Sequence, residues 1–264
     1  MQTITSKDNE QIKHIRKLKE KKYRNQYKEY IIEGIKLVKE AIAEQVCIKT
    51  IVICDGCDTE SNFTPKLLYE IAKLNCLTVP ERIFKDLIDV ENSQGILAVV
   101  EKKQEECKID YKQDMLVLLD NIQDPGNLGT IIRTIDSIGL NQVLISKGTT
   151  DAFSSKAIRS SMGAIFRVNI VECENLVETI EKIKENNYKV VATTLESKQS
   201  IYDISYHKCA IIIGNEANGI EKNILNQTDI TVKIPMTGRT ESLNASVATG
   251  IVLYEYVRQK IQKI

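Results

Sequence analysis

Three loops of the chain are rich in side chains that could bind a ligand or assist a group-transfer reaction. Each follows a short apolar run, and the loops span residues 120–130, 214–219 and 235–248. Their Asn, Asp and Ser residues form tight turns and cap helices, and their glycines let backbone amides approach a ligand. The apolar runs are typical of strands buried on both faces of a sheet. Because ligands bind beyond the carboxyl ends of strands in open α/β sheets, the three loops together predict a binding site.

The first loop contains Asn121, Asp124 and Asn127 and leads into a predicted helix that carries Arg133. One interpretation is an ordinary β–α turn in which Asn127 caps the helix, with Arg133 in a surface ion pair. The alternative is that Arg133, less than two turns from the start of the helix, points back toward the strand ends. This loop by itself does not decide between the two.

The other two loops also allow both a structural and a functional interpretation. Gly214-x-Glu216-x-x-Gly219 brings backbone amides close to a ligand, but it lacks the Lys-Ser/Thr pair of a P-loop. Ser242 and Asn244 lie at the start of the last predicted helix, where they could cap it or bind an anionic or carbonyl group. Each loop taken alone is a weak indication of function.

Hydrophobic periodicity predicts alternating helices and strands along the whole chain. In the first half we expect helices at 6–22, 33–44, 65–74 and 83–90 and strands at 49–54, 77–79 and 95–100. In the second half we expect strands at 115–119, 142–145, 166–171, 189–193, 210–213 and 230–234, with helices at 128–138, 155–162, 176–185 and 244–261. The alternation favours an α/β fold with a mostly parallel sheet covered on both faces. Nine charged residues make 101–114 the predicted linker between domains at 1–100 and 115–264.

Composition narrows the class of protein. The chain has 42% hydrophobic and 27% charged residues, which is close to ordinary globular usage. It has no apolar run of about 18 residues and no secretory signal pattern, so we expect no membrane partner. Seven cysteines, an odd count, favour a reducing, cytoplasmic setting. Cys54 and Cys57 form a C-x-x-C pair without a second pair, so we expect free thiols and no metal site.

Charge is distributed unevenly. The 36 basic and 36 acidic residues cancel, which argues against a non-specific coat on nucleic acid. Residues 1–30 nevertheless carry nine Lys and Arg against four acidic residues. This arm is either a solvated helix face or a surface that contacts phosphates, and both interpretations remain open.

Taken together, the motifs resemble those of the SpoU/TrmH branch of the SPOUT methyltransferases. The matching residues are Asn121-x-x-Asp-Pro-x-Asn-x-Gly-x-x-x-Arg133, Gly214-x-Glu-x-x-Gly219 and Ile234-Pro-Met-x(5)-Ser-Leu-Asn-x-Ser-x-Ala248, in the family's order. The resemblance covers residues 115–261, and Arg159–Arg167 is similar to the family's Ser- and Gly-rich stretch. Glu33-Gly34 is similar to an early Glu-Gly pattern in the family's N-terminal RNA-binding domain.

The resemblance implies a fold, a reaction and a cofactor. The fold would be a C-terminal parallel-sheet SPOUT domain with a trefoil knot, preceded by a small α/β RNA-binding domain related to a ribosomal protein, in a homodimer. The reaction would be methylation of a ribose 2′-hydroxyl in RNA by S-adenosylmethionine. The family's cofactor contacts fall on Thr193, Gly214, Ile234, Met236 and Leu243.

The family's essential arginine matches Arg133. A general-base role is demanding, because lowering the pKa of an arginine from its ordinary, strongly basic value to near neutrality costs roughly 8 kcal/mol. Our hypothesis is that Arg133 grips a neighbouring phosphate and stabilises the developing alkoxide. We expect Asn127 and Ser242 to position the ribose and Arg133, Asn244 to fix the loop and the substrate, and Glu216 to orient the loops without transferring a proton.

Several alternatives remain at this point. Ribosomal RNA of the 23S type is favoured over transfer RNA, because a separate N-terminal domain with a basic arm suits a large RNA. A non-catalytic RNA-binding protein with this fold, a base methyltransferase and a general two-domain α/β binding protein are the competing interpretations. The last would leave the three motifs as coincidence.

Overall fold

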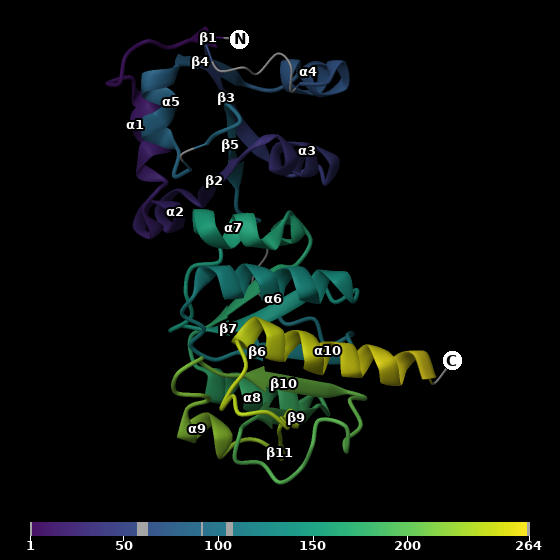
Figure 1. The fold of residues 1–264 in the computed structure, drawn as a ribbon. Coiled ribbons are helices and arrows are strands. Elements are labelled where there is room, and N and C mark those ends of the chain that lie inside the picture. Colours follow the sequence, from purple (N-terminus) through teal and green to yellow (C-terminus); the bar gives the residue numbers. More distant parts are fainter. Residues whose placement is uncertain (1, 57–62, 91, 104–107, 263–264) are drawn as a thin grey trace. The chain divides into compact units, whose positions relative to one another are not determined.

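The computed structural model describes residues 2–56, 63–90, 92–103 and 108–262 (Figure 1). Its internal contacts divide the chain into two compact units. One is Met1–Gln104 with Phe153–Phe166, and the other is Glu105–Ala152 with Arg167–Ile264. The domain limits expected from the sequence stay a prediction, and residues 104–107 of the expected linker lie outside the described residues.

The first unit contains a mixed five-stranded sheet. Its strand order is β1 (Gln2–Thr3), β4 (Cys76–Pro80), β3 (Ile48–Asp55), β5 (Ile96–Glu101) and β2 (Glu29–Glu33). Strand β5 runs antiparallel to β3 and to β2, and the other pairs are parallel. The helices of this unit are α1 (Glu10–Lys17), α2 (Lys21–Tyr27), α3 (Ile35–Ala43), α4 (Pro65–Ala72), α5 (Glu81–Leu87) and α7 (Ser155–Ser161), and α7 is followed by the 3₁₀ turn η1 (Ala164–Phe166). Strand β2, which the sequence analysis missed, pairs along its whole length with β5.

The single helix expected at residues 6–22 is wrong. Asn9 caps α1 by accepting a hydrogen bond from the Gln11 amide, and the helix ends at Lys17. The guanidinium of Arg24 donates to the carbonyl oxygens of Leu18 and Lys19, at 2.8 and 2.6 Å. A continuous helix would use those carbonyls for its own backbone bonds. Arg24 therefore stabilises the turn that separates α1 from α2.

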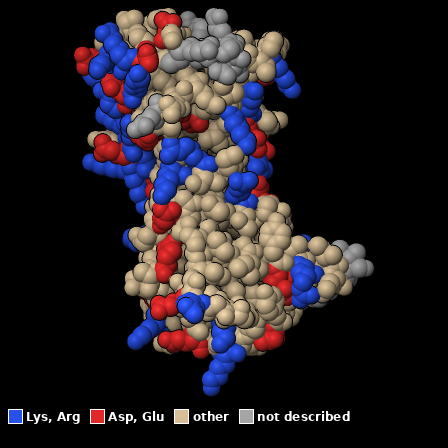
Figure 2. All heavy atoms as spheres, viewed as in Figure 1, with Lys and Arg blue, Asp and Glu red and all other residues tan. Residues whose placement is uncertain are grey.

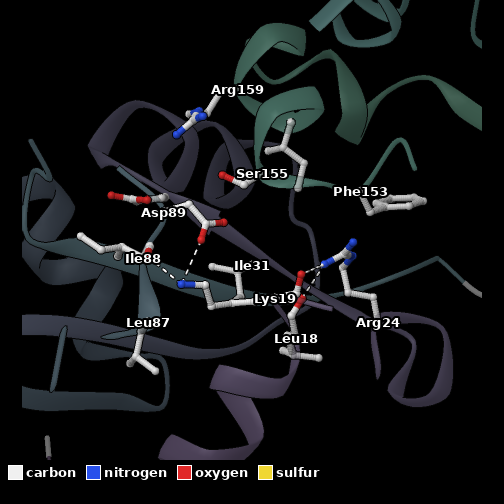
Figure 3. A pocket seen from close by; sticks show the side chains of 12 residues that line it. Leu18, Lys19, Arg24, Ile31, Leu87, Ile88, Asp89, Phe153, Ser155 and Arg159 are labelled. Carbon is white, nitrogen blue, oxygen red and sulfur yellow. Dashed lines mark hydrogen bonds and ion pairs between the residues drawn. The ribbon is translucent and has the colours of Figure 1, made fainter. Parts of the chain in front are cut away.

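The same turn borders a cavity in the first unit (Figure 3). Lys19 lines it and donates to the Ile88 carbonyl at 2.9 Å while pairing with Asp89 at 2.9 Å. Arg24 also lines it and is only 6% exposed. The cations of this turn are thus engaged in holding α1, α2 and the segment after α5 in place.

Cys54 lies at the end of β3 and is disulfide-bonded, so the expectation of a free thiol is wrong at this residue. Cys57 lies outside the described residues. None of the helices in the described ranges is both long and apolar enough to span a membrane.

The second unit contains a six-stranded sheet in which every pair is parallel. The strand order is β11 (Ile230–Val232), β9 (Lys189–Thr193), β10 (Cys209–Ile213), β6 (Met115–Leu119), β7 (Gln142–Ser146) and β8 (Asn169–Cys173). The parallel α/β sheet expected from the sequence is therefore confirmed. The expected strand at 166–171 begins three residues later, because Phe166 belongs to η1.

Helices pack on both faces of this sheet. They are α6 (Pro125–Ser137), α8 (Leu176–Glu185), α9 (Lys222–Leu225) and α10 (Ala245–Gln262). Residues of α8 and α9 share one buried cluster with Leu116, Leu118 and Ile212. Side chains alternate along a strand, so Val117 and Ile211 face the opposite side and are also fully buried. Helices α6 and α10 pack against each other on that side (Figure 1).

Replacing Arg24 by Met should lower the free energy of unfolding by about 2 kcal/mol, because two carbonyl oxygens lose their donor in a buried setting. Urea unfolding followed by circular dichroism measures the change. Lys21→Met, at an exposed position of the same helix, α2, is the control and should stay within about 0.5 kcal/mol of the wild type. Equal stability of the two variants would show that Arg24 does not hold the turn.

Candidate active site

The first two loops start side by side because their strands are neighbours in the sheet. Leu119 of β6 and Ile213 of β10 are paired in register, and the Asp120 amide donates to the Ile213 carbonyl at 2.9 Å. The loops at 120–130 and 214–219 therefore leave the same edge of the sheet, at the carboxyl ends of its central strands.

The loop from Gly214 to Gly219 closes on itself. The amides of Asn215 and Gly219 donate to each other's carbonyl oxygens, both at 3.0 Å, and Asn215 Oδ1 accepts from the amides of Ala217 and Asn218. A Cβ on Gly214 would lie 2.4 Å from the carbonyl carbon of Gly219, a clash that backbone cannot relieve. Only glycine therefore fits at position 214, and the loop holds Glu216 out at the surface.

Asn127 is not the cap of α6. Asp124 caps it instead, accepting a hydrogen bond from the Asn127 amide at 2.9 Å, with Pro125 in the first turn. The helix consequently begins three residues earlier than the sequence analysis expected. This leaves the Asn127 side chain available to reach the other loops.

A chain of hydrogen bonds joins all three loops through Asn127. Its Nδ2 donates to Glu216 Oε1 at 2.7 Å, and its Oδ1 accepts from Asn244 Nδ2 at 2.9 Å. Asn244 Oδ1 in turn accepts from the amides of Ser246 and Val247, so Asn244 also caps α10. The structure thus brings three of the predicted catalytic residues together.

A second group of polar side chains joins the first two loops at the point where they leave the sheet. Asp120 accepts from the Glu221 amide at 3.0 Å and from Asn121 Nδ2 at 3.0 Å, and Asn215 Nδ2 donates to the Asn121 carbonyl at 2.7 Å. Asp120 is 1% exposed, and this burial raises the pKa of its carboxyl. Neither Asp120 nor Asn215 is among the site residues predicted from the sequence. Asp120 comes directly after one buried strand, and Asn215 follows the glycine after another. These positions are the signal that could have identified both residues.

Arg133 is separate from this network. It lies on the exposed face of α6 between Thr130 and Ser137, and none of the described residues forms a hydrogen bond or ion pair with its side chain. Six residues at 3.6 per turn place it on a different side of the helix from Asn127. The guanidinium is therefore free to meet a ligand.

The predicted cofactor residues lie at the same edge of the sheet. Thr193 ends β9, pairs with Val232 of β11 and donates from Oγ1 to the Ile212 carbonyl at 3.1 Å. Gly214 follows β10, the next strand, and Ile234 lies two residues beyond β11. Leu243 is half-buried, whereas Met236 and Ser242 are exposed.

This edge fits the chemistry of S-adenosylmethionine. Glycine at position 214 lets the loop fold tightly against the backbone of Gly219 and Ile220. Ile234, Met236 and Leu243 offer apolar surface for an adenosine. Among the described residues, no three His, Cys, Asp or Glu side chains gather so as to hold a metal ion.

Comparison with known proteins places the chain in a family. Residues 114–254 match the model of the SpoU rRNA Methylase family, and residues 9–98 match the MRM3-like substrate binding domain. The 23S rRNA (guanosine(2553)-2′-O)-methyltransferase RlmP of Bacillus subtilis is 34% identical over 255 residues, which cover 96% of this chain and 98% of RlmP.

Solved structures agree. An AdoMet-bound rRNA methyltransferase from Sinorhizobium meliloti has a TM-score of 0.85 at 30% identity, covering 98% of both chains. An RNA 2′-O ribose methyltransferase has a TM-score of 0.81 at 29% identity, covering 98% of this chain and 99% of its own. The fold, the joined loops and these matches define an S-adenosylmethionine-dependent RNA 2′-O-methyltransferase. The chain belongs to the SpoU rRNA methylase family, which confirms the resemblance found in the sequence.

Replacing Gly214 by Ala should lower the affinity for S-adenosylmethionine by more than about tenfold, since the added methyl group forces the backbone of the loop apart. Isothermal titration calorimetry measures the affinity. Gly238→Ala is the matched control, because a Cβ there meets nothing within 4 Å. Equal affinities for the two variants would exclude Gly214 from the cofactor site.

Replacing Asn127 by Ala should lower kcat/KM for methyl transfer by roughly a hundredfold, because the three loops lose their shared hydrogen-bonding partner and the reacting groups shift. Affinity for S-adenosylmethionine should change less. Thr130→Ala, on the exposed face of the same helix, should keep kcat/KM within about twofold of the wild type. A mild effect of Asn127→Ala would mean that the loops hold their positions without this amide.

Proposed function

We propose that this protein methylates a ribose 2′-hydroxyl of ribosomal RNA, of the 23S type. The observation that carries the proposal is the hydrogen-bonded joining of Asn127, Glu216 and Asn244 at the edge of the sheet next to Gly214. RlmP, named for 2′-O-methylation of 23S rRNA, matches along nearly the whole chain, and a substrate-binding domain model matches residues 9–98. The match to RlmP supports a ribosomal over a transfer RNA substrate.

We assign the cofactor contacts to Thr193, Gly214, Ile234, Met236 and Leu243, the residues at the carboxyl ends of β9, β10 and β11 and in the segment that follows. S-adenosylmethionine supplies the methyl group when bound. Hydrogen bonds inside the loop at 214–219 hold its backbone in one conformation, which suits a binding site that is formed before the ligand arrives.

Arg133 binds the phosphate next to the target ribose and stabilises the alkoxide that develops as the 2′-hydroxyl loses its proton. Its exposed side chain, without a partner among the described residues, is suited to this contact. Glu216 orients the loops, because one of its carboxylate oxygens already accepts from Asn127. Ser242, two residues before Asn244, positions the ribose, and Asn244 holds its loop against α6.

The chain after β11 supports a trefoil knot. Strand β11 is the outermost strand of the sheet and pairs with β9, whereas the next helix, α10, packs against α6. The connecting segment must therefore cross the ends of β9 and β10. Lys233 exchanges backbone hydrogen bonds of 2.9 Å with Gln199 and Ile201 in the loop between those strands. We propose that the segment passes through this loop.

A homodimer is supported by the exposed side of α10. Val247, Tyr254 and Ile261 recur every seven residues and are 50%, 55% and 63% exposed. Residues at this spacing share one side of a helix, and a second copy would cover them. We place the protein in the cytoplasm, where ribosomal RNA is found.

The test is transfer of tritiated methyl groups from S-adenosylmethionine to ribosomal and transfer RNA, with nucleoside analysis of the product. We expect a 2′-O-methylated nucleoside in ribosomal RNA and no transfer by Arg133→Ala. Arg133→Lys should keep partial activity, since a positive charge remains. A decrease of more than about a thousandfold in Arg133→Lys, with RNA binding intact, contradicts a purely electrostatic role.

Other outcomes select the alternatives. Label in transfer RNA alone would change the substrate. A base-methylated nucleoside would contradict ribose chemistry. Cofactor binding without transfer to free ribosomal RNA or to ribosomal particles would favour a non-catalytic RNA-binding protein.

A further inference from the structure

The basic residues of the N-terminal arm divide into two groups. Five of the nine are engaged within the first unit: Lys7 and Arg16 with Asp86, Lys13 with Glu10, Lys19 with Asp89, and Arg24 with the carbonyls of Leu18 and Lys19. The other four are Lys17, Lys21, Lys22 and Lys28, called here the lysine patch. All four are exposed, and none of the described residues forms a hydrogen bond or ion pair with their ammonium groups.

Aromatic rings organise the lysine patch. The ammonium groups of Lys17, from α1, and Lys22, from α2, each lie 5.6 Å from the centroid of the Tyr23 ring. Tyr23 stacks on Tyr27 at 6.1 Å, and Tyr27 contacts the ring of His14 at 4.5 Å. The half-buried tyrosines thus hold charges from two helices on one side of the unit, where they stay solvated and available.

The charge of this surface is positive, which suits an anionic partner. Glu20 is the acidic residue between Lys17 and Lys28, so the patch keeps a net charge of +3. Figure 2 shows Lys and Arg side chains gathered on the side where Figure 1 places α1 and α2. Lys102, which donates to Asn25 at 3.1 Å, adds a further cation beside α2.

The geometry favours RNA over a membrane surface. Helices that bind lipid insert an apolar face, but the apolar residues in α1 and directly after it, Ile12, Ile15 and Leu18, are at most 2% exposed and belong to the core. Lysine ammonium groups on flexible stems bind phosphates as point charges and read no base sequence.

We propose that the lysine patch docks the phosphate backbone of the substrate RNA and determines affinity without contacting the methylated nucleotide. This inference rests on the proposed function, because it takes RNA as the substrate. It adopts the phosphate-contacting interpretation, one of the two that the sequence left open for the basic arm.

The experiment compares the full-length triple variant Lys17→Gln, Lys21→Gln, Lys22→Gln with a matched control that removes the same charge elsewhere in the first unit. The control is Lys36→Gln, Lys39→Gln, Lys66→Gln, at exposed positions of α3 and α4. Binding of a fluorescein-labelled RNA hairpin is measured by anisotropy from about 50 to about 200 mM KCl. Thermal unfolding of both variants checks that the fold is intact.

We expect the patch variant to bind about tenfold to a hundredfold more weakly at low salt. The slope of log affinity against log salt should fall in magnitude by about three, roughly one for each phosphate that is no longer neutralised by a lysine. The control should stay within about threefold of the wild type at every salt concentration. In turnover with deproteinised ribosomal RNA, KM of the patch variant should rise more than kcat falls.

Equal salt slopes for the patch variant and the control would overturn the proposal. So would binding to phosphatidylserine vesicles that disappears in the patch variant while RNA binding is retained, since that would identify a membrane surface. Patch-dependent RNA binding by a wild-type protein that transfers no methyl group would contradict the proposed function alone and leave the docking surface standing.

Discussion

The site depends on one side-chain amide. Asn127 donates to Glu216 and accepts from Asn244, and these residues are 89 and 117 positions away along the chain. An amide has both a donor and an acceptor end, so a single Asn can join a carboxylate on one side to another amide on the other. Aspartate could not donate to Glu216, and serine could not span both partners. The residue type at position 127 therefore follows from its two neighbours.

That amide is available only because Asp124 caps α6. If Asn127 capped the helix, its Oδ1 would be turned toward the backbone amides of the first turn and could not accept from Asn244. The buried Asp120 has a comparable role at the end of β6, where its carboxylate accepts hydrogen bonds from the Asn121 side chain and from the amide of Glu221. Two aspartates, one at the helix start and one at the strand end, thus fix the backbone on which Asn127 and the Gly214 loop are positioned.

The sequence indicated much of the framework. The runs at 115–119 and 189–193 are strands with the expected limits, and α8 begins and ends as expected. Such elements are determined by burial, which local periodicity reports. The failures involve contacts from distant residues. The helix expected at 6–22 is interrupted by the Arg24 guanidinium, and β2 exists because β5, over sixty residues later, pairs with it.

The same limit applied to the site. Residue types at 127, 216 and 244 suggested a function through resemblance, but hydrogen bonds between them require the strand order β9-β10-β6, which periodicity does not contain.

The distribution of free positive charge was also not predictable from the sequence. A net charge of zero argued against a general nucleic-acid coat, yet the structure shows that ion pairing consumes basic residues selectively. Carboxylates pair with Lys7, Lys13, Arg16 and Lys19. The ammonium groups of Lys17 and Lys22 instead lie over the ring of Tyr23. A neutral chain can therefore carry a local positive surface. Such a surface limits phosphate contact to one side of the unit, whereas a broadly basic protein would bind RNA in any orientation.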